Sequence, residues 1–405
     1  MNGRRVHHAR RRAALGLLTS VAVATVAGGA GDAPATAATA ATTSASPTAP
    51  LAGTLSSESG DTAVVPMGHL NQPLNTFWQL FVRPADSVGW QLVTPPGVAD
   101  NSGLVVDEDS GNLGAGAGPN SVLAGFEPSQ DLTFSPLAAS TNRGSTWSAG
   151  LVPTGLAAVP DALAGAPGGP MLALGRAGGG VVLASSGSIS TWSTVSRRST
   201  LASSTAGRAC GVGLLTAVAF APSGAPLVAG TCTEPGRTGL FERSGDRWLA
   251  VGPAGPASST TSVLRLVDMG GAVNGLVLLR SRSTDRLVAM TTASGTSWST
   301  SQPLRLDAGA RIVSTGVTAG GGFVVLWTTR GGQTVLATES GPASEWQLLP
   351  APPPGTAAVA VGPSGDVDAL VVDSTEFTDR RLDPATGQWI TVASQSVPID
   401  FGSSS

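Results

Sequence analysis

Acidic residues are the side chains best suited to chemistry in this chain, and they form two clusters. Asp107, Glu108 and Asp109 precede a glycine, which resembles part of a calcium loop because hard cations prefer several oxygen ligands from a tight turn. The later acidic ligand of such a loop is absent, and a solvated turn is the alternative. The second cluster consists of Asp366, Asp368, Asp373 and Glu376. Because glycoside hydrolysis needs two carboxylates about 5 to 9.5 Å apart, paired acids could support a carbohydrate-active hydrolase or lyase.

Composition limits other catalytic chemistry. His7 and His8 lie in a predicted export signal, so only His69 remains in the mature chain. A Ser-His-Asp hydrolase needs an imidazole base, and no Gly-x-Ser-x-Gly nucleophile turn accompanies this histidine. The glycine-rich segment 111–118 lacks the lysine and following helix of a phosphate loop, and we interpret it as a flexible insertion. We therefore assign no catalytic, cofactor-binding or metal-ligating residue.

The two cysteines, Cys210 and Cys232, predict one disulfide. An even number of cysteines in an exported chain favours a bridge over metal binding or catalysis. The turn Pro222-Ser223-Gly224 lies between them, so a bridge across that hairpin is geometrically reasonable. Two reduced, buried thiols are the alternative.

The N-terminus predicts export. Five arginines precede residue 13, residues 13–27 are apolar and small, and a small-residue cleavage site follows. We expect a signal peptide over 1–37, a disordered Ala/Thr/Ser/Pro-rich linker over 38–61 and a folded domain over 62–405. The mature product should be secreted, extracellular or cell-wall associated, without a membrane anchor. Its formal net charge of −3 becomes more negative when those arginines leave, which argues against nucleic acid as a partner.

Tryptophans reveal how the domain is organised. Seven of them recur at intervals of 43 to 57 residues: Trp90, Trp147, Trp192, Trp248, Trp298, Trp346 and Trp389. A self-similar period of this length points to a propeller or a solenoid. Within each repeat, short β-rich runs lie between turns, and Gly224 and Gly365 each precede their tryptophan by 24 residues.

These repeats predict an all-β fold with no helix-length amphipathic pattern. Four antiparallel strands per repeat, with the tryptophan opening the fourth, describe one blade of a β-propeller. We favour seven blades and keep six as the alternative. The first blade lacks its first hairpin in this interpretation, and the segment 396–401 could supply a closing strand. The tryptophans are expected to pack between blades.

One turn resembles a known repeat motif. Ser140, Asn142, Gly144, Thr146 and Trp147 follow the pattern Ser-x-Asp-x-Gly-x-Thr-Trp of the Asp-box, the bacterial neuraminidase repeat, with asparagine in the acidic position. A degraded second copy spans 291–298. The motif is structural: its Asp or Asn bonds nearby backbone amides, its glycine is left-handed and its tryptophan packs inward.

The resemblance to Asp-box, sialidase-like propellers implies the fold but not the activity. Sialidases of this kind use a tyrosine nucleophile and an arginine triad, whereas this chain has no tyrosine and nothing groups Arg83, Arg143 and Arg311. We expect a monomeric, non-enzymatic binding or assembly module for an extracellular protein or glycan, without a cofactor. The alternative is the carbohydrate-active hydrolase or lyase. A deep funnel of converging carboxylates would favour the enzyme, and a shallow apolar face would favour the binder.

Overall fold

The described residues form seven groups of short strands, each arranged as four successive strands. The computed structural model describes residues 53–57, 60–68, 76–95, 104–107, 122–126, 137–149, 160–165, 169–175, 180–269, 271–318, 320–341, 344–373 and 375–397. All of these belong to one structural unit, Pro47–Ser405. His69, Glu108, Asp109 and the segment 111–118 lie outside the described residues, as does the predicted signal peptide.

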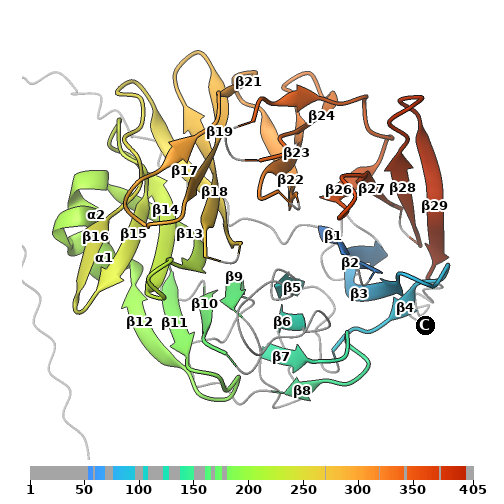
Figure 1. Ribbon diagram of the computed structural model, residues 1–405, viewed down its shortest axis with the longest axis horizontal. Coiled ribbons are helices and arrows are strands. Elements are labelled where there is room, and N and C mark those ends of the chain that lie inside the picture. Colours follow the sequence, from blue (N-terminus) through green and yellow to red (C-terminus); the bar gives the residue numbers. More distant parts are fainter. Residues whose placement is uncertain are drawn as a thin grey trace, which may run out of the picture. The chain divides into compact units, whose positions relative to one another are not determined.

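The strands follow one another as antiparallel meanders, here called blades 1 to 7 (Figure 1). Blade 1 contains β1 (Gly53–Ser57), β2 (Gly60–Gly68), β3 (Thr76–Pro84) and β4 (Gln91–Leu92). Blade 2 contains β5 (Leu104–Asp107), β6 (Val122–Phe126), β7 (Leu137–Ser140) and β8 (Ser148–Ala149). Blade 3 contains β9 (Pro160–Gly165), β10 (Met171–Gly175), β11 (Val181–Ser185) and β12 (Ser193–Arg197). Blade 4 contains β13 (Val212–Phe220), β14 (Pro226–Cys232), β15 (Leu240–Ser244) and β16 (Arg247–Ala250).

The remaining blades repeat this order. Blade 5 contains β17 (Thr260–Asp268), β18 (Val273–Arg280), β19 (Asp285–Thr292) and a fourth strand split into β20 (Ser299–Thr300) and β21 (Leu304–Leu306). Blade 6 contains β22 (Arg311–Val317), β23 (Phe323–Thr328), β24 (Thr334–Thr338) and β25 (Gln347–Leu348). Blade 7 contains β26 (Thr356–Val361), β27 (Val367–Val372), β28 (Glu376–Leu382) and β29 (Trp389–Ser396). Blades 4 and 5 are joined into one sheet because Thr231 and Cys232 of β14 pair with β17.

The core lies between blades. Each of the seven buried apolar clusters combines residues of two neighbouring blades, such as Leu276 of blade 5 with Phe323 of blade 6. One cluster joins Val65 of blade 1 to Phe377 of blade 7, which closes the ring. The unit is a β-propeller of four-stranded antiparallel blades, and the fold prediction is confirmed.

The tryptophans mark one position in every blade. Each stands immediately before the fourth strand or at its beginning, as the sequence predicts. Several also connect blades through the indole Nε1–H: Trp147 donates to the carbonyl of Val93 (2.8 Å), and Trp298 donates to the carbonyl of Val251. Both acceptors follow the fourth strand of the preceding blade. The indole therefore fixes one blade to its neighbour by a hydrogen bond as well as by packing.

Two local predictions need correction, the incomplete first blade and the absence of helices. Blade 1 is complete, because β1 pairs with β2 from Gly53 onward, before the expected boundary at residue 62. The Ser/Thr/Gly-rich sequence of β1 has a low β-strand propensity, and it forms a strand because its backbone pairs with β2. Ser396 ends β29 of blade 7. Residues 398–401 lie outside the described part, so a closing strand from this segment stays a prediction.

Two helices, α1 (Arg198–Ser203) and α2 (Thr205–Cys210), connect blades 3 and 4, where no helix was expected. Each has six residues, too few to show a helical period in the sequence. The hydroxyl of Ser204 accepts the amide of Gly207 and caps α2, and Gly211 ends it with a φ of 61°.

Candidate binding groove and charged seam

An open groove of about 560 Å³ lies where blade 5 meets blade 6. It is on the upper face of the ring, defined here as the side on which the first strand of each blade begins. The end of β18, the start of β19 and the start of β22 all reach this face because the strands alternate in direction. Loops on one face of a rigid scaffold are the usual place for recognition.

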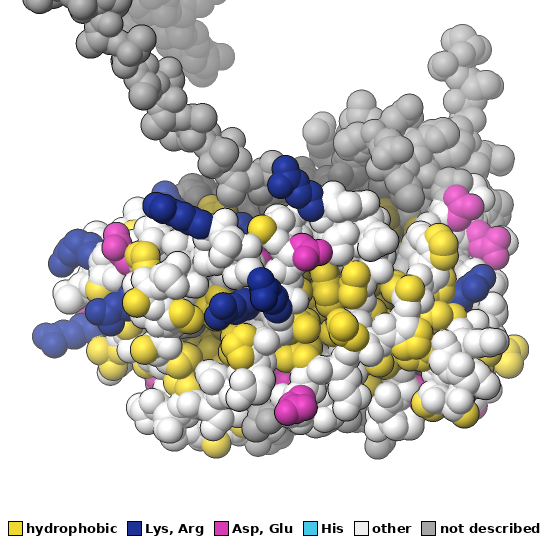
Figure 2. All heavy atoms as spheres, turned by 90° about the horizontal axis from the view of Figure 1, so that it is seen from above, with side chains coloured by type: hydrophobic (Ala, Val, Ile, Leu, Met, Phe, Trp, Pro, Cys, Tyr) yellow, Lys and Arg dark blue, Asp and Glu magenta, His cyan; other side chains and the backbone are white. Residues whose placement is uncertain are grey.

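The groove combines an apolar floor with a charged rim. Leu264, Leu278 and Ile312 line it, and Arg280 and Arg311 stand exposed at its border. Leu278 is 2% exposed and belongs to the cluster that joins the two blades, so the floor is held rigidly. The side of the ring that carries β21 and β24 also shows apolar side chains exposed between charged ones (Figure 2). This arrangement suits ligand binding and contains no nucleophile-base pair.

A tight turn shapes one wall of the groove. Ser281 donates its hydroxyl to the carbonyl of Thr284 (2.7 Å) and accepts the Thr284 amide (3.1 Å). The turn sets Arg280 opposite Asp285 in the β18–β19 register, and Asp285 is 5% exposed at the start of its strand. The groove therefore holds one buried carboxylate and two exposed guanidinium groups.

The second acidic cluster lies outside the groove lining, and two of its four members, Asp366 and Asp368, are at the seam between blades 7 and 1. Arg381 bonds both carboxylate oxygens of Asp368 at 2.8 and 3.1 Å, and its Nη1 lies 3.8 Å from Asp366. Asp373 and Glu376 are at the other end of blade 7, where they flank the β27–β28 turn. The cluster is thus divided, and its two closest acids share one guanidinium group.

A second arginine completes this charged seam. Arg83 of β3 binds Asp61 of β2 and, 296 residues away in sequence, Asp379 of β28 at 2.8 Å. Burial, reinforced by the charge of Asp368, raises the pKa of Asp379 to about 7. Burial also raises the pKa of Asp368, although the hydrogen bond from Arg381 opposes it. Each of the two guanidinium groups at this seam lies between two carboxylates, an arrangement typical of a structural ion network.

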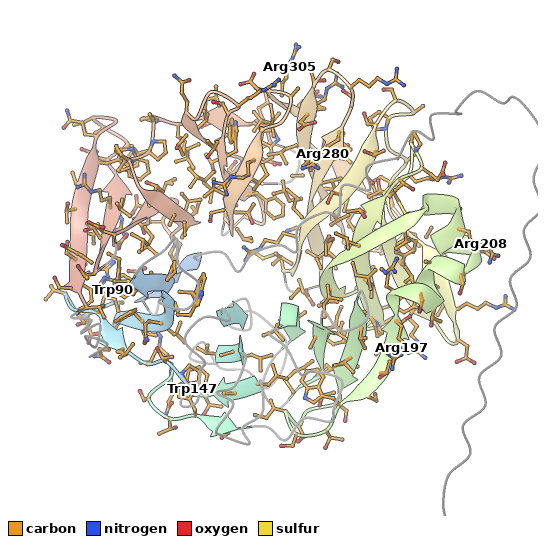
Figure 3. All side chains as sticks on the ribbon, turned by 180° about the vertical axis from the view of Figure 1, so that it is seen from behind. Trp90, Trp147, Arg197, Arg208, Arg280 and Arg305 are labelled. Atoms are coloured by element: carbon orange, nitrogen blue, oxygen red, sulfur yellow. A yellow bond between two sulfur atoms is a disulfide. The ribbon has the colours of Figure 1, made fainter. Side chains whose placement is uncertain are left out.

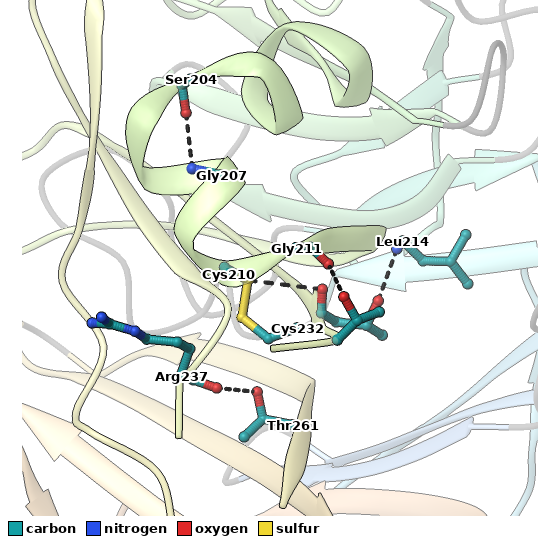
Figure 4. Close-up of a disulfide and its surroundings, with 10 residues drawn as sticks. Ser204, Gly207, Cys210, Gly211, Leu214, Cys232, Arg237 and Thr261 are labelled. Carbon is teal, nitrogen blue, oxygen red and sulfur yellow. Dashed lines mark hydrogen bonds between the residues drawn. A yellow bond between two sulfur atoms is a disulfide. The ribbon is translucent and has the colours of Figure 1, made fainter. Parts of the chain in front are cut away.

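The cysteines form the predicted disulfide. Cys210 at the end of α2 is bonded to Cys232 at the end of β14, with a Cα–Cα distance of 4.9 Å (Figure 4). Because Val212 pairs with Cys232, the bridge closes the open end of the β13–β14 hairpin. The turn Pro222-Ser223-Gly224 closes its other end, and Gly224 has a φ of 77°. The disulfide thus ties the helical connection to blade 4.

The motif-like turn of blade 2 has a dense hydrogen-bond network. Asn142 Oδ1 accepts the Thr146 amide (2.8 Å) and the Ser140 hydroxyl (2.9 Å). Ser140 Oγ accepts the Gly144 amide (2.7 Å), and Gly144 has a φ of 80°. Trp147 then packs over the seam with blade 1 (Figure 3). These hydrogen bonds are local, and that of Trp147 reaches the neighbouring blade, so this turn contributes to the scaffold.

The buried carboxyl of Glu339 was not identified from the sequence as a site residue. Glu339 follows β24 and is fully buried, and neither carboxylate oxygen has a hydrogen-bond partner. Burial raises its pKa to about 8, so it is protonated at neutral pH. It stands seven residues before Trp346, as Ser140 stands seven before Trp147. A hydroxyl that caps the turn in blade 2 is thus replaced by an unpartnered carboxyl in blade 6.

Within the described residues, no three His, Cys, Asp or Glu side chains are grouped so that they could hold a metal ion. The calcium-loop-like segment at Asp107, Glu108 and Asp109 is not tested by this, because its side chains lie outside the described part. None of the helices in the described part is both long and apolar enough to cross a membrane.

No protein-family model matches the chain, and no curated protein matches it. Solved β-propeller structures do match over most of their length. A six-bladed fucose-binding lectin of Aleuria aurantia is 12% identical, with a TM-score of 0.41, over 87% of this chain and 97% of its own. YCF48 bound to a D1 peptide is 13% identical, with a TM-score of 0.46, over 84% and 94%. The β-propeller domain of Swd1 from Myceliophteria thermophila is 9% identical, with a TM-score of 0.46, over 78% and 91%. At such values these similarities carry no argument about activity.

Proposed function

We propose that this protein is a binding or assembly module that recognises an extracellular protein or glycan through the groove between blades 5 and 6. The observation that carries the proposal is the groove itself: an open, apolar floor bordered by Arg280 and Arg311 on a rigid seam. A concave, mostly apolar surface with a few convergent polar groups is the usual form of a binding site.

The alternative, a carbohydrate-active enzyme, has less support. Among the carboxylates named from the sequence, Asp366 and Asp368 share Arg381. The described lining of the groove has a single carboxylate, that of Asp285, which was not among them. A glycosidase needs two carboxylates facing one substrate bond. We therefore keep the enzyme as the second hypothesis, tested by incubating the full chain with sialic-acid and polysaccharide substrates.

We further propose that the protein is secreted and that the Ser140–Trp147 turn is an Asp-box. The arginine-rich, apolar N-terminus supports secretion, and the disulfide agrees with an oxidising compartment. The hydrogen bonds of Asn142 and the left-handed Gly144 support the motif, whose role here is to shape a turn. Recovery of a processed chain from the culture medium would support secretion, and exclusively cytosolic chain would contradict it.

The binding function can be tested at the groove floor. The protein, purified after expression of the full chain, would be presented with extracellular proteins and glycans, and its binding partner identified and titrated. Ile312→Ser removes part of the floor, and the matched control Ile390→Ser removes an isoleucine that is 52% exposed on blade 7. We expect Ile312→Ser to weaken binding about tenfold, since burying one such side chain contributes about 1.5 kcal/mol or more.

Circular dichroism and thermal melting would first establish that both variants fold. Equal affinity of Ile312→Ser and wild type would exclude the groove as the binding surface. The absence of any protein or glycan ligand, together with turnover of a polysaccharide, would replace the binding function with the enzymatic one.

A further inference from the structure

Five exposed arginines gather on the upper face around blade 5. They are Arg280 at the end of β18, Arg282 in the following turn, Arg286 in β19, Arg305 in β21 and Arg311 at the start of β22. Two aspartates, Asp285 and Asp307, lie among them, so five positive charges less two negative charges leave a local net charge of +3. The whole chain has a formal net charge of −3, which makes this concentration of positive charge a local feature.

These guanidinium groups make no ion pair or hydrogen bond with the described residues. Within the described residues none of the five forms an ion pair or donates a side-chain hydrogen bond, whereas Arg83 and Arg381 are ion-paired and Arg243 bonds backbone carbonyls. Arg286 and Arg305 are also directly opposite each other in the β19–β21 register. Like charges in that relation repel each other, and an anion between them would remove the repulsion.

The arginines lie on both sides of the blade 5 sheet. Arg280 lies opposite Asp285 in the β18–β19 register, and both line the groove toward blade 6. Arg286 follows Asp285 in β19, and because successive side chains of a strand alternate, it points to the other side of the sheet. Figure 3 shows Arg280 and Arg305 on the same part of the ring, away from Arg197 and Arg208. A ligand with one negative charge could meet only one pair. A long ligand with repeated charges could contact both pairs across the edge of the sheet.

Hydroxyl groups lie between the two arginine pairs. The turn carries Ser281, Ser283 and Thr284, and Ser283 is exposed. Ser281 Oγ bonds within the turn, whereas the exposed Ser283 hydroxyl can donate to and accept from the hydroxyls of a sugar. Guanidinium groups bind carboxylate, sulfate and phosphate in a planar, bidentate way. No aromatic side chain lines the groove in the described part, which disfavours stacking on a neutral sugar ring.

We infer that the upper face of blade 5 binds an acidic polysaccharide, whose repeated anionic groups span the arginine pairs Arg280/Arg311 and Arg286/Arg305. This inference rests on the proposed binding function and names its ligand class. Attraction between these charges brings the polymer to the face, and the groove receives a residue of the polymer between Arg280 and Arg311.

The inference is tested with defined polymers on the full chain. Polygalacturonate, dextran sulfate and polyphosphate supply carboxylate, sulfate and phosphate; uncharged dextran is the control, and poly-glutamate presents the same charge on a peptide. We expect polygalacturonate or dextran sulfate to bind, with affinity falling as NaCl is added. Arg280→Ala/Arg311→Ala and Arg286→Ala/Arg305→Ala should each lower affinity about tenfold or more, whereas Arg197→Ala/Arg247→Ala, at exposed arginines elsewhere, should not.

Each other outcome has a distinct meaning. Equal loss in the control variant, or unchanged binding in both test variants, would overturn the assignment to blade 5. Binding of poly-glutamate but of neither polysaccharide would identify an acidic peptide as the ligand and overturn the glycan class. Binding of polyphosphate alone would also overturn the glycan class, with a polymeric phosphate as the ligand. If no polymer binds while the partner found by affinity capture still does, the inference fails and the proposed binding function stands.

Discussion

The buried carboxyl of Glu339 should make the fold lose stability as pH rises. The substitution Glu339→Gln keeps the size and the neutral form of this side chain and removes its ability to ionise. In the folded protein its pKa is about 8, because the group is fully buried and neither oxygen has a partner. In the unfolded chain it returns to its ordinary value of 4.5. Between these two values the unfolded state releases a proton that the folded state retains.

The size of the effect follows from the two pKa values. A folded pKa above the unfolded one means that the stability present below pH 4.5 is lost as pH rises toward 8. The difference of about 3.5 units, at 1.36 kcal/mol per unit, gives a loss of at most about 5 kcal/mol by pH 9 and about 3 kcal/mol at pH 7. This is a large part of the free energy of unfolding of an ordinary domain.

Urea unfolding followed by tryptophan fluorescence at pH 4.5, 7 and 9 would measure this. Glu339→Gln should match wild type at pH 4.5, apart from a constant offset, and exceed it progressively at pH 7 and 9. Glu345→Gln is the matched control, because Glu345 is an exposed glutamate six residues away. If wild type and Glu339→Gln lose stability in parallel from pH 4.5 to 9, the carboxyl is not buried in its protonated form and the reasoning is refuted.

Three further predictions concern the ring and its bonds. Asp379→Asn should flatten the decline in stability between pH 4 and 7, because burial raises the Asp379 pKa to about 7; an unchanged slope in a pH-melting series would count against it. Cys210→Ser/Cys232→Ser should cost about 3 kcal/mol in urea unfolding, as expected for a bridge across 22 residues, and no loss would show that the bridge is not formed. Trp147→Phe should lower stability by about 1 kcal/mol more than Trp248→Phe, because the Trp147 indole donates to the preceding blade, whereas the Trp248 indole has no hydrogen bond within the described residues; equal losses would assign the effect to packing alone.

The repeat could be predicted from the sequence because each blade carries its own local signals. A tryptophan before the fourth strand and a turn such as the one at Gly224 recur within about 50 residues, and strand pairing inside a blade is equally local. The disulfide could also be predicted, since the two cysteines are only 22 residues apart and flank one hairpin turn in the sequence. Blade 1 was incomplete in the prediction because β1 has a linker-like composition and acquires strand structure only by pairing with β2.

The groove and the charged seam could not be predicted because they arise between blades. Arg280 and Arg311 are 31 residues apart and border one groove only after blades 5 and 6 pack. Arg83 and Asp379 come from opposite ends of the domain. The burial of Glu339 could not be predicted either, because a glutamate that follows a strand is normally exposed to solvent.

Ring closure explains why a charged network is placed at the seam between blades 7 and 1. All strands of blade 1 come from the beginning of the domain and all strands of blade 7 from its end, so the described sheets share no strand that would tie the ends together. The seam depends instead on side chains: the contact of Phe81 with Phe377, at a centroid distance of 4.8 Å, and the ion pair of Arg83 with Asp379. An apolar contact tolerates sliding, whereas a buried guanidinium needs its carboxylates in fixed positions, since an unpaired buried charge costs several kcal/mol. Apolar packing at the seam, including this aromatic contact, therefore supplies attraction, and the charged network selects the register in which the first and last blades meet.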